Sequence, residues 1–310
     1  MINKNIIVRI AEGLGNQLFM YAHAYSLSKK KNYNLYIDNT SGYYKSEYKH
    51  TTFILDKFEM QIIICNYIFK YDNFYKNILR KILKIIDFFI EYFIQKKIFL
   101  IEKKSINKIT NYNENYLNTS FTNNFIIEGF FESEKYFKSY RRDLQLLFVV
   151  KNNYIDNNNK FINLLKENES VSILIRTNRY KNAKVEQKFI SDQINYVKKS
   201  IIYFKKNKEH PTFFVWSNNI NKIKTYFKDI ENLLFIDYEK NNNINLDETA
   251  YKTLNDFNLF KYSKHFIVGL STFHWWGAWL NDNPEKICIR PSNICNSANL
   301  DYWPDDWIII

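Results

Sequence analysis

Residues 171–216 read VSILIRTNRYKNAKVEQKFISDQINYVKKSIIYFKKNKEHPTFFVW and carry the clearest structural pattern in the chain. Residues 171–175 and 213–216 are apolar runs of the length that predicts buried strands. Between them, apolar residues recur every three or four positions, the period of one helical face. These residues are Ile190, Ile194, Val197, Ile201 and Phe204. A strand, a helix and another strand in this order predict parallel neighbouring strands.

The same alternation continues towards the C-terminus. The pattern predicts three more strands and three more helices: strands at residues 233–236, 266–268 and 287–289, and helices at residues 219–227, after the capping residue Asp247, and at residues 271–280. Such alternation predicts a parallel sheet with helices on both faces. Ligands of such sheets bind beyond the carboxyl ends of the strands.

The N-terminal half opens with a similar unit. Residues 6–10 predict a strand, residues 12–15 form a glycine-containing turn, and residues 18–25 show helical spacing. Residues 35–37 predict a second strand, which ends at Asp38. This order predicts a β-α-β opening.

The middle of the chain predicts further elements and a domain boundary. Residues 62–102 predict helical structure, residues 125–127 a strand, and Ser133 the cap of a helix that reaches Phe148. The polar stretch 151–160 is the expected boundary. We therefore expect an N-terminal domain over residues 1–155 with a helical insertion at residues 62–104, and a C-terminal domain over residues 156–310.

Composition limits the class of protein. Hydrophobic residues make up 46% of the 310 residues, which excludes a disordered chain. The net charge of +12 favours partners that carry phosphate, although a bias towards Lys, Asn and Ile codons would also produce it. The basic residues are dispersed and no nucleic-acid-binding motif is present, so we expect no nucleic-acid partner.

The chain shows no targeting or membrane-spanning pattern. Its N-terminus lacks the features of a signal peptide, and the three cysteines have no regular spacing. The longest apolar segment, residues 78–100, is interrupted by seven charged residues and predicts an amphipathic helix or helical pair. It either packs on its domain or contacts an anionic membrane surface. We expect a cytoplasmic protein, peripheral at the inner face of the cytoplasmic membrane.

Three short segments have the residue types of a phosphate site. Residues 12–17, EGLGNQ, place glycines between a strand and a helix, where backbone N–H groups can approach a ligand. Arg176 directly follows a strand, and a guanidinium there can donate two hydrogen bonds to a diphosphate. Ser271 and Thr272 begin a helix after another strand. The paired tryptophans that follow, Trp275 and Trp276, fit core packing better than a sugar platform.

Several other chemistries are excluded by what these segments lack. Leu18 stands where a dinucleotide fingerprint needs a third glycine, so no nicotinamide or flavin site is expected. No G-x-S-x-G elbow supports a serine hydrolase. No Asp-x-Asp follows a strand, so no metal site is expected.

Taken together, the segments resemble glycosyltransferase family 11, the α-1,2-fucosyltransferases. Residues 13–22, GLGNQLFMYA, resemble the family's opening G-G-L-G-N-Q-M-F-Q-Y-A. Residues 128–137, EGFFESEKYF, resemble its G-Y-W-Q-S-E-K-Y-F, and residues 271–280, STFHWWGAWL, its S-S-F-S-W-W-G-A-W-L. Residues 283–286 and 304–308 follow in the same order. The resemblance spans nearly the whole chain.

The resemblance implies a GT-B-like fold with two Rossmann-like domains, the C-terminal one binding the nucleotide. It implies inverting transfer of L-fucose from GDP-fucose to a galactose-containing acceptor, lipid-linked during O-antigen or capsule synthesis. No cofactor or metal is required. The donor-binding residues would be Gly13, Gly15, Asn16, Gln17, Arg176, Arg179, Ser217, Ser271 and Thr272, with Arg176 stabilising the leaving diphosphate.

The chain departs from the family pattern in one motif that bears on mechanism. The family's V-H-V-R-R-G-D-Y reads ILIRTNRY at residues 173–180, so Arg176 is kept while Thr177 and Arg179 replace an arginine and an aspartate. Two further changes are Leu270 for the usual asparagine and Glu12 for the first glycine of the opening.

The motifs leave the general base and the exact activity open. The candidates for the base are Asp38, Glu128 and His23, which lie near matched segments. The altered arginine motif keeps two alternatives in view: a transferase of the same fold with a changed donor or acceptor, and a non-catalytic binder of nucleotide or sugar.

Overall fold

The computed structural model describes residues 4–44, 51–103, 110–292, 299 and 301–310, which form two compact units. The first unit runs to Val149 and the second begins at Val150, six residues before the expected boundary. Near the C-terminus, residues 301–304 return to the first unit, whereas residues 305–310 stay with the second. This return was not expected. It is held by the Lys135–Asp301 ion pair and by the ring of Tyr302 against Phe19.

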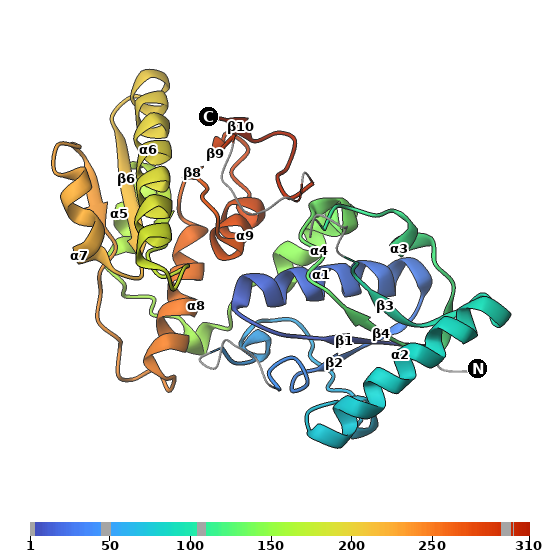
Figure 1. Cartoon of the computed structure of the whole chain (residues 1–310). Helices are drawn as coiled ribbons and strands as arrows, with labels where there is room; N and C mark the ends of the chain where they lie inside the picture. The colour runs from blue at the N-terminus through green and yellow to red at the C-terminus, as the bar shows by residue number, and fades with distance from the viewer. Residues whose placement is uncertain (1–3, 45–50, 104–109, 293–298, 300) are drawn as a thin grey trace. The chain divides into compact units, whose positions relative to one another are not determined.

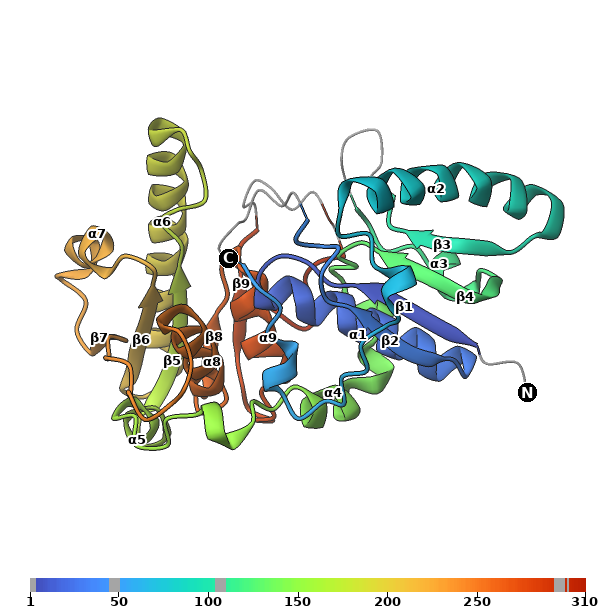
Figure 2. The ribbon, with the colours of Figure 1, turned by 90° about the horizontal axis from the view of Figure 1, so that it is seen from below.

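The first unit contains a four-stranded parallel sheet in the order β2-β1-β4-β3. Its elements are β1 (Asn5–Arg9), α1 (Leu14–Lys31), β2 (Asn34–Asp38), η1 (Leu55–Lys57), η2 (Tyr67–Phe69), α2 (Phe74–Ile94), β3 (Lys97–Ile101), α3 (Asn115–Asn118), β4 (Phe121–Glu128), η3 (Glu134–Tyr136), η4 (Lys138–Tyr140) and α4 (Arg141–Leu147). Helices α1 and α2 cover opposite faces of the sheet (Figures 1 and 2). Successive side chains of a strand point to opposite faces of the sheet, so each face has its own set to bury. On the α2 face, Ile7, Phe99 and Ile126 share one buried cluster with Leu83 of α2.

Two predicted helices in this unit are wrong in part. Residues 62–102 were expected to be helical throughout, but residues 97–101 form β3 beside β4. The apolar run that follows Lys96 suits a strand, and the left-handed Gln95 ends α2 just before it. Residue 104, the expected end of the insertion, lies outside the described residues. The helix from Ser133 to Phe148 is instead two short 3-10 turns and α4, although Ser133 does accept a hydrogen bond from the Lys135 N–H.

The second unit contains a six-stranded parallel sheet in the order β10-β9-β8-β5-β6-β7. Its elements are η5 (Asn152–Tyr154), α5 (Phe161–Glu167), β5 (Glu169–Ile175), α6 (Ala183–Asn207), β6 (Pro211–Ser217), α7 (Ile220–Ile223), η6 (Lys224–Phe227), β7 (Leu233–Phe235), α8 (Glu248–Phe260), β8 (His265–Ile267), α9 (Thr272–Leu280), β9 (Cys288–Arg290) and β10 (Ile308–Ile309). The predicted strands and helices of this half are confirmed, and Asp247 caps α8 through the Ala250 N–H. β10, α5 and the short turn η5 were missed: β10 has too few residues to show a period, and α5 and η5 lie in or directly after the polar stretch taken as the boundary.

Both faces of this sheet are covered. The apolar face of α6 packs on Val171, Ile173 and Ile175 of β5. The opposite face meets α8 and α9, where Ser172 Oγ lies 2.9 Å from His274 Nε2 and the Trp216 ring packs on Phe260. Helices thus lie on the two faces of the sheet. Ligands of this fold class bind at a third place, beyond the carboxyl ends of the strands.

Candidate functional site

The C-terminal sheet changes its direction of connection between β5 and β8. β5 is followed by α6 and β6 on one side, whereas β8 pairs with its other side. A crevice forms at such a point because the connections leave in opposite directions. Arg176 follows β5, and Ser271 lies four residues beyond the end of β8. Arg179 Nη1 donates to the Leu270 carbonyl oxygen at 3.0 Å, so the two predicted segments meet.

The backbone of Arg176 is held while its side chain remains exposed. The Arg176 N–H donates to Gln193 Oε1 at 3.3 Å, and Gln193 Nε2 donates to the Arg176 carbonyl at 2.9 Å. Gln193 is 2% exposed on the buried face of α6, most of whose residues are apolar. Its polarity at a buried helical position is the signal that sequence analysis missed. The pair fixes the backbone from which the Arg176 side chain extends.

Two further residues join this edge from the segment that follows β6, Asn218 and, in α7, Lys222. The Thr177 N–H donates to Asn218 Oδ1 at 2.9 Å, and Asn218 Nδ2 donates to Thr177 Oγ1 at 3.1 Å. Lys222 Nζ lies 3.5 Å from the Thr177 carbonyl oxygen. Lys222 therefore adds a third cation to Arg176 and Arg179 beside the same strand ends. A cluster of this sign suits the negative charge of a diphosphate.

The start of α9 supplies an unpaired hydroxyl. Ser271 is the N-cap residue, but its side chain makes no capping hydrogen bond. Its Oγ is buried and has no hydrogen-bond partner among the described residues. Buried polar atoms in this state usually meet a ligand or water. Thr272 is half-buried beside it, and Trp275, Trp276 and Trp279 are core residues at most 1% exposed.

Ser217 has a local role as well. Its Oγ accepts a hydrogen bond from the Asn219 N–H at 3.1 Å, which shapes the turn between β6 and α7. The expected donor-binding role of Ser217 thus rests on its position at the end of β6 rather than on a hydroxyl directed at a ligand.

The glycine turn of the first unit links β1 to α1. Glu12 has a φ of 61°, a left-handed conformation that glycine adopts without strain. This explains a glycine at that place in the family pattern. Gly13 has a φ of −76°, and a Cβ built there meets nothing within 4 Å. Neither backbone conformation nor internal packing requires glycine at position 13, so the open space there fits the close approach of a ligand.

The two polar residues after this turn are held inside the protein. Gln17 is fully buried; its amide donates to the carbonyls of Glu12 and Thr52 and accepts from the Ile54 N–H. Asn16 Nδ2 donates to Glu12 Oε2 at 2.6 Å. The donor-binding role expected of Gln17 is therefore replaced by a structural one, because its side-chain amide is already satisfied.

The three candidates for the general base all have structural roles. Asp38 is 1% exposed and accepts from the N–H groups of Thr40 and Ser41. Glu128 is paired with two cations of α2, described below. His23 is fully buried against the Phe131 ring, and burial lowers its pKa to about 3, so it stays neutral. None of the three presents a free proton-accepting atom to a substrate.

A carboxylate that sequence analysis missed lies near the ends of β6 and β7. Asp256 Oδ1 accepts from Tyr238 Oη at 2.7 Å and from Trp216 Nε1 at 3.2 Å. Burial raises the pKa of Asp256 to about 6, against the lowering effect of these two hydrogen bonds. A carboxyl group with a raised pKa beside a ligand-binding edge is a candidate functional group.

We expect Gly13→Ala to fold normally but to bind substrate poorly. The added methyl group contacts no atom of the chain, so the unfolding temperature should stay within about 1 °C of wild type. If a ligand approaches the backbone here, the donor KM should rise roughly tenfold to a hundredfold. Thermal unfolding and steady-state kinetics check this, and unchanged kinetics would remove Gly13 from the site.

We expect Asp256→Asn to stabilise the protein at pH 8 but not at pH 4. The folded-state pKa of about 6 exceeds the ordinary 3.8, so the folded state resists ionisation more than the unfolded chain. The free-energy cost of ionising Asp256 in the folded protein is absent below about pH 4. It grows between about pH 4 and pH 6 and is constant at higher pH. It amounts to at most about 3 kcal/mol, less where water reaches the carboxylate.

Thermal unfolding at the two pH values measures this difference. Asp282→Asn, at an exposed position, is the matched control. An equal gain for Asp256→Asn at pH 4 and pH 8 would contradict the raised pKa.

Neither a metal cluster nor a membrane-spanning helix is found in the part of the chain that the structure describes. No group of three or more His, Cys, Asp or Glu residues there could hold a metal ion. No helix among the described residues is long and apolar enough to cross a membrane.

The family model for glycosyl transferase family 11 matches residues 5–310, so the chain belongs to this family of glycosyltransferases. An Escherichia coli alpha-1,2-colitosyltransferase is 28% identical, with 98% of each chain covered. The O-antigen biosynthesis glycosyltransferase WbnK of Escherichia coli is 25% identical over 95% of this chain and 98% of its own.

Solved structures show the same GT-B-like fold. The fucosyltransferase NodZ from Bradyrhizobium matches with a TM-score of 0.54 at 13% identity, covering 96% of this chain and 98% of its own. A mutant of Arabidopsis thaliana FUT1 in complex with GDP matches with a TM-score of 0.54 at 10% identity, covering 94% of this chain and 72% of its own. The predicted fold class, with parallel sheets in both halves, is therefore confirmed.

Proposed function

We propose that this glycosyltransferase moves L-fucose from GDP-fucose to a hydroxyl group of a galactose-containing glycan, with inversion at the anomeric carbon. The observation that carries the proposal is the cationic edge of Arg176, Arg179 and Lys222 beside the unpaired Ser271 hydroxyl, in a chain of family 11. NodZ, of similar fold, has been solved after soaking with GDP-fucose.

In the proposed reaction, the acceptor oxygen attacks the anomeric carbon while the bond from that carbon to the diphosphate oxygen breaks. The electron pair of the broken bond stays on GDP, and the acceptor proton passes to a general base. Negative charge therefore grows on the terminal phosphate. Preorganised cations stabilise that charge, and Arg176 is the cation whose backbone is fixed beside it. We propose that no metal is required.

A second donor deserves a direct test. The relative at 28% identity is an alpha-1,2-colitosyltransferase, and colitose is the 3-deoxy form of L-fucose. The replacements at Thr177 and Arg179 change the motif that follows β5. A site that hydrogen-bonds a sugar hydroxyl rejects the analogue lacking it by about 10⁴-fold, whereas a site that ignores the hydroxyl accepts both.

The acceptor is proposed as a surface glycan under construction, lipid-linked at the inner face of the cytoplasmic membrane. The O-antigen glycosyltransferase among the relatives supports this setting.

A donor panel tests the proposal. Purified protein is given GDP-fucose, GDP-colitose, a UDP-sugar or a dTDP-sugar with soluble β-galactosides and no added metal, and nucleotide release and product mass are followed. Turnover of GDP-fucose above all others is the expected result. Preference for GDP-colitose would favour the second donor. Binding of GDP without turnover of any donor would indicate a non-catalytic binder.

A further inference from the structure

Helix α2 packs on its own unit with its charged side chains. Arg80 Nε and Lys84 Nζ each lie 2.6 Å from a carboxylate oxygen of Glu128, which is only 6% exposed. Asp87 is buried and accepts from the Ile98 N–H. Together with the half-buried Leu83, these residues lie on the side that meets β3 and β4. The usual arrangement of a surface helix is the reverse, with apolar residues facing the core.

The opposite side of α2 is apolar and exposed. Twelve of the 22 exposed large hydrophobic residues of the described chain belong to this one helix of 21 residues. They are Phe74, Tyr75, Ile78, Leu79, Ile82, Ile85, Ile86, Phe88, Phe89, Tyr92, Phe93 and Ile94, which we call the α2 apolar stripe. Single exposed hydrophobic residues are common on protein surfaces, but a contiguous stripe marks an interaction site.

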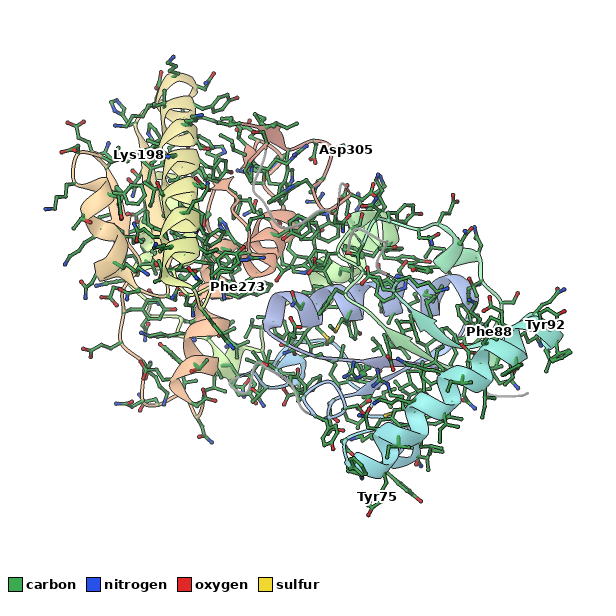
Figure 3. All side chains as sticks on the ribbon, viewed as in Figure 1. Tyr75, Phe88, Tyr92, Lys198, Phe273 and Asp305 are labelled. Atoms are coloured by element: carbon green, nitrogen blue, oxygen red, sulfur yellow. The ribbon has the colours of Figure 1, made fainter. Side chains whose placement is uncertain are left out.

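The stripe is continuous along the helix. Residues 78, 82, 85, 89 and 92 recur every three or four positions and so share one face. Tyr75 and Tyr92 lie towards the two ends, with exposed fractions of 81% and 75% (Figure 3). Tyrosines near the ends and aliphatic residues between them suit the boundary between lipid headgroups and acyl chains.

The charge around the stripe distinguishes between two partners for it, a second copy of the chain and an anionic lipid surface. Residues 70–97 contain seven basic and three acidic residues. The three carboxylates all interact within the unit. Asp72 contacts Lys76 and Thr40, Asp87 accepts from the Ile98 N–H, and Glu91 pairs with Lys97. Lys81 and Lys96 are exposed beside the stripe. Pairing of two such helices from two copies would bring like charges together, whereas an anionic lipid surface is complementary.

We propose that the α2 apolar stripe inserts into the surface of an anionic membrane, with α2 parallel to the membrane plane. The ion pairs of Glu128 then hold the helix to its unit from the aqueous side. Apolar insertion is the main attachment, and Lys81 and Lys96 add attraction to anionic headgroups. This deepens the proposed function, because it names the surface through which the enzyme would reach a lipid-linked acceptor.

Vesicle flotation with the full-length chain tests the proposal. The vesicles contain phosphatidylcholine alone or with about a third phosphatidylglycerol. The stripe variant is Phe88→Ser with Phe89→Ser and Phe93→Ser, and the charge variant is Lys81→Gln with Lys96→Gln. Ile202→Ser, at an exposed apolar position of α6, is the matched control.

Wild type and the control should float with the anionic vesicles. The stripe variant should lose at least about tenfold in binding. The charge variant should lose roughly fivefold per lysine at low salt. Turnover on a soluble acceptor should be the same for all four proteins, which separates this proposal from the proposed donor chemistry.

Three outcomes would overturn the proposal. Wild type that does not bind anionic vesicles, or a stripe variant that binds like wild type, would show that the stripe does not insert. A wild-type mass of two chains in light scattering, reduced to one chain in the stripe variant and without vesicle binding, would assign the stripe to a second copy instead.

Discussion

Arg176→Ala should lower kcat/KM for the sugar donor by a factor of about 10² to 10³. The guanidinium is exposed at the carboxyl end of β5, at the point where the sheet reverses its connections. Losing one preorganised donor to a developing anion typically costs about 2.7–4 kcal/mol in the transition state. Most of the loss should fall on kcat, because the charge on the leaving diphosphate is largest there.

The fold should survive this change. Gln193 holds residue 176 through its backbone N–H and carbonyl, and alanine keeps both groups. Lys198→Ala removes an exposed cation from α6 and serves as the control for a general loss of charge. Arg176→Lys should recover part of the rate, since the charge remains but the two-pronged geometry is lost. Retention of more than a third of wild-type kcat/KM by Arg176→Ala would remove this residue from the reaction.

Gly42→Ala should cost about 3 kcal/mol or more in the free energy of unfolding. A Cβ at Gly42 would lie 1.9 Å from the Ile10 carbonyl oxygen and 2.7 Å from the Ala11 Cβ. The clash is with backbone at the end of β1, so no side-chain rotation relieves it. For a unit of this size, the melting temperature should fall by roughly 6–12 °C.

Gly13→Ala is the matched control for this prediction. Both glycines lie close to the carboxyl end of β1, but only Gly42 is packed against backbone. Circular dichroism of both variants measures the difference. A melting temperature of Gly42→Ala within about 2 °C of wild type would contradict the close approach of the loop after β2 to β1.

The sequence predicted the C-terminal sheet well because its strands are long apolar runs separated by strongly periodic helices. The β5–α6–β6 unit and the Asp247 cap are local features, and local features are visible in a sequence. β3 was missed because its apolar run follows the apolar face of α2 without a glycine or proline between them. The left-handed Gln95 separates the two elements, and glutamine gives no signal for that conformation.

The site was only partly predictable for a related reason. Arg176, Arg179, Ser271 and Thr272 could be proposed from the sequence because each follows a strand. Asn218, Lys222 and Asp256 depend on the pairing of β5 with β6, in which Leu174 lies opposite Trp216. Such contacts arise from register, which no single segment shows. The three base candidates are buried, because nearness to a matched segment does not place a side chain at the surface.

Above all, we propose that the edge beside Arg176 binds the diphosphate of a guanine nucleotide. Calorimetric titration of the full-length chain with GDP, guanosine and UDP tests it most directly. GDP should bind at least about thirtyfold more tightly than guanosine, because guanosine lacks the diphosphate and its two charge-assisted contacts. Arg176→Ala should remove most of this difference, and UDP should bind more weakly than GDP. Equal affinity for GDP and guanosine, or no binding of GDP, would contradict it.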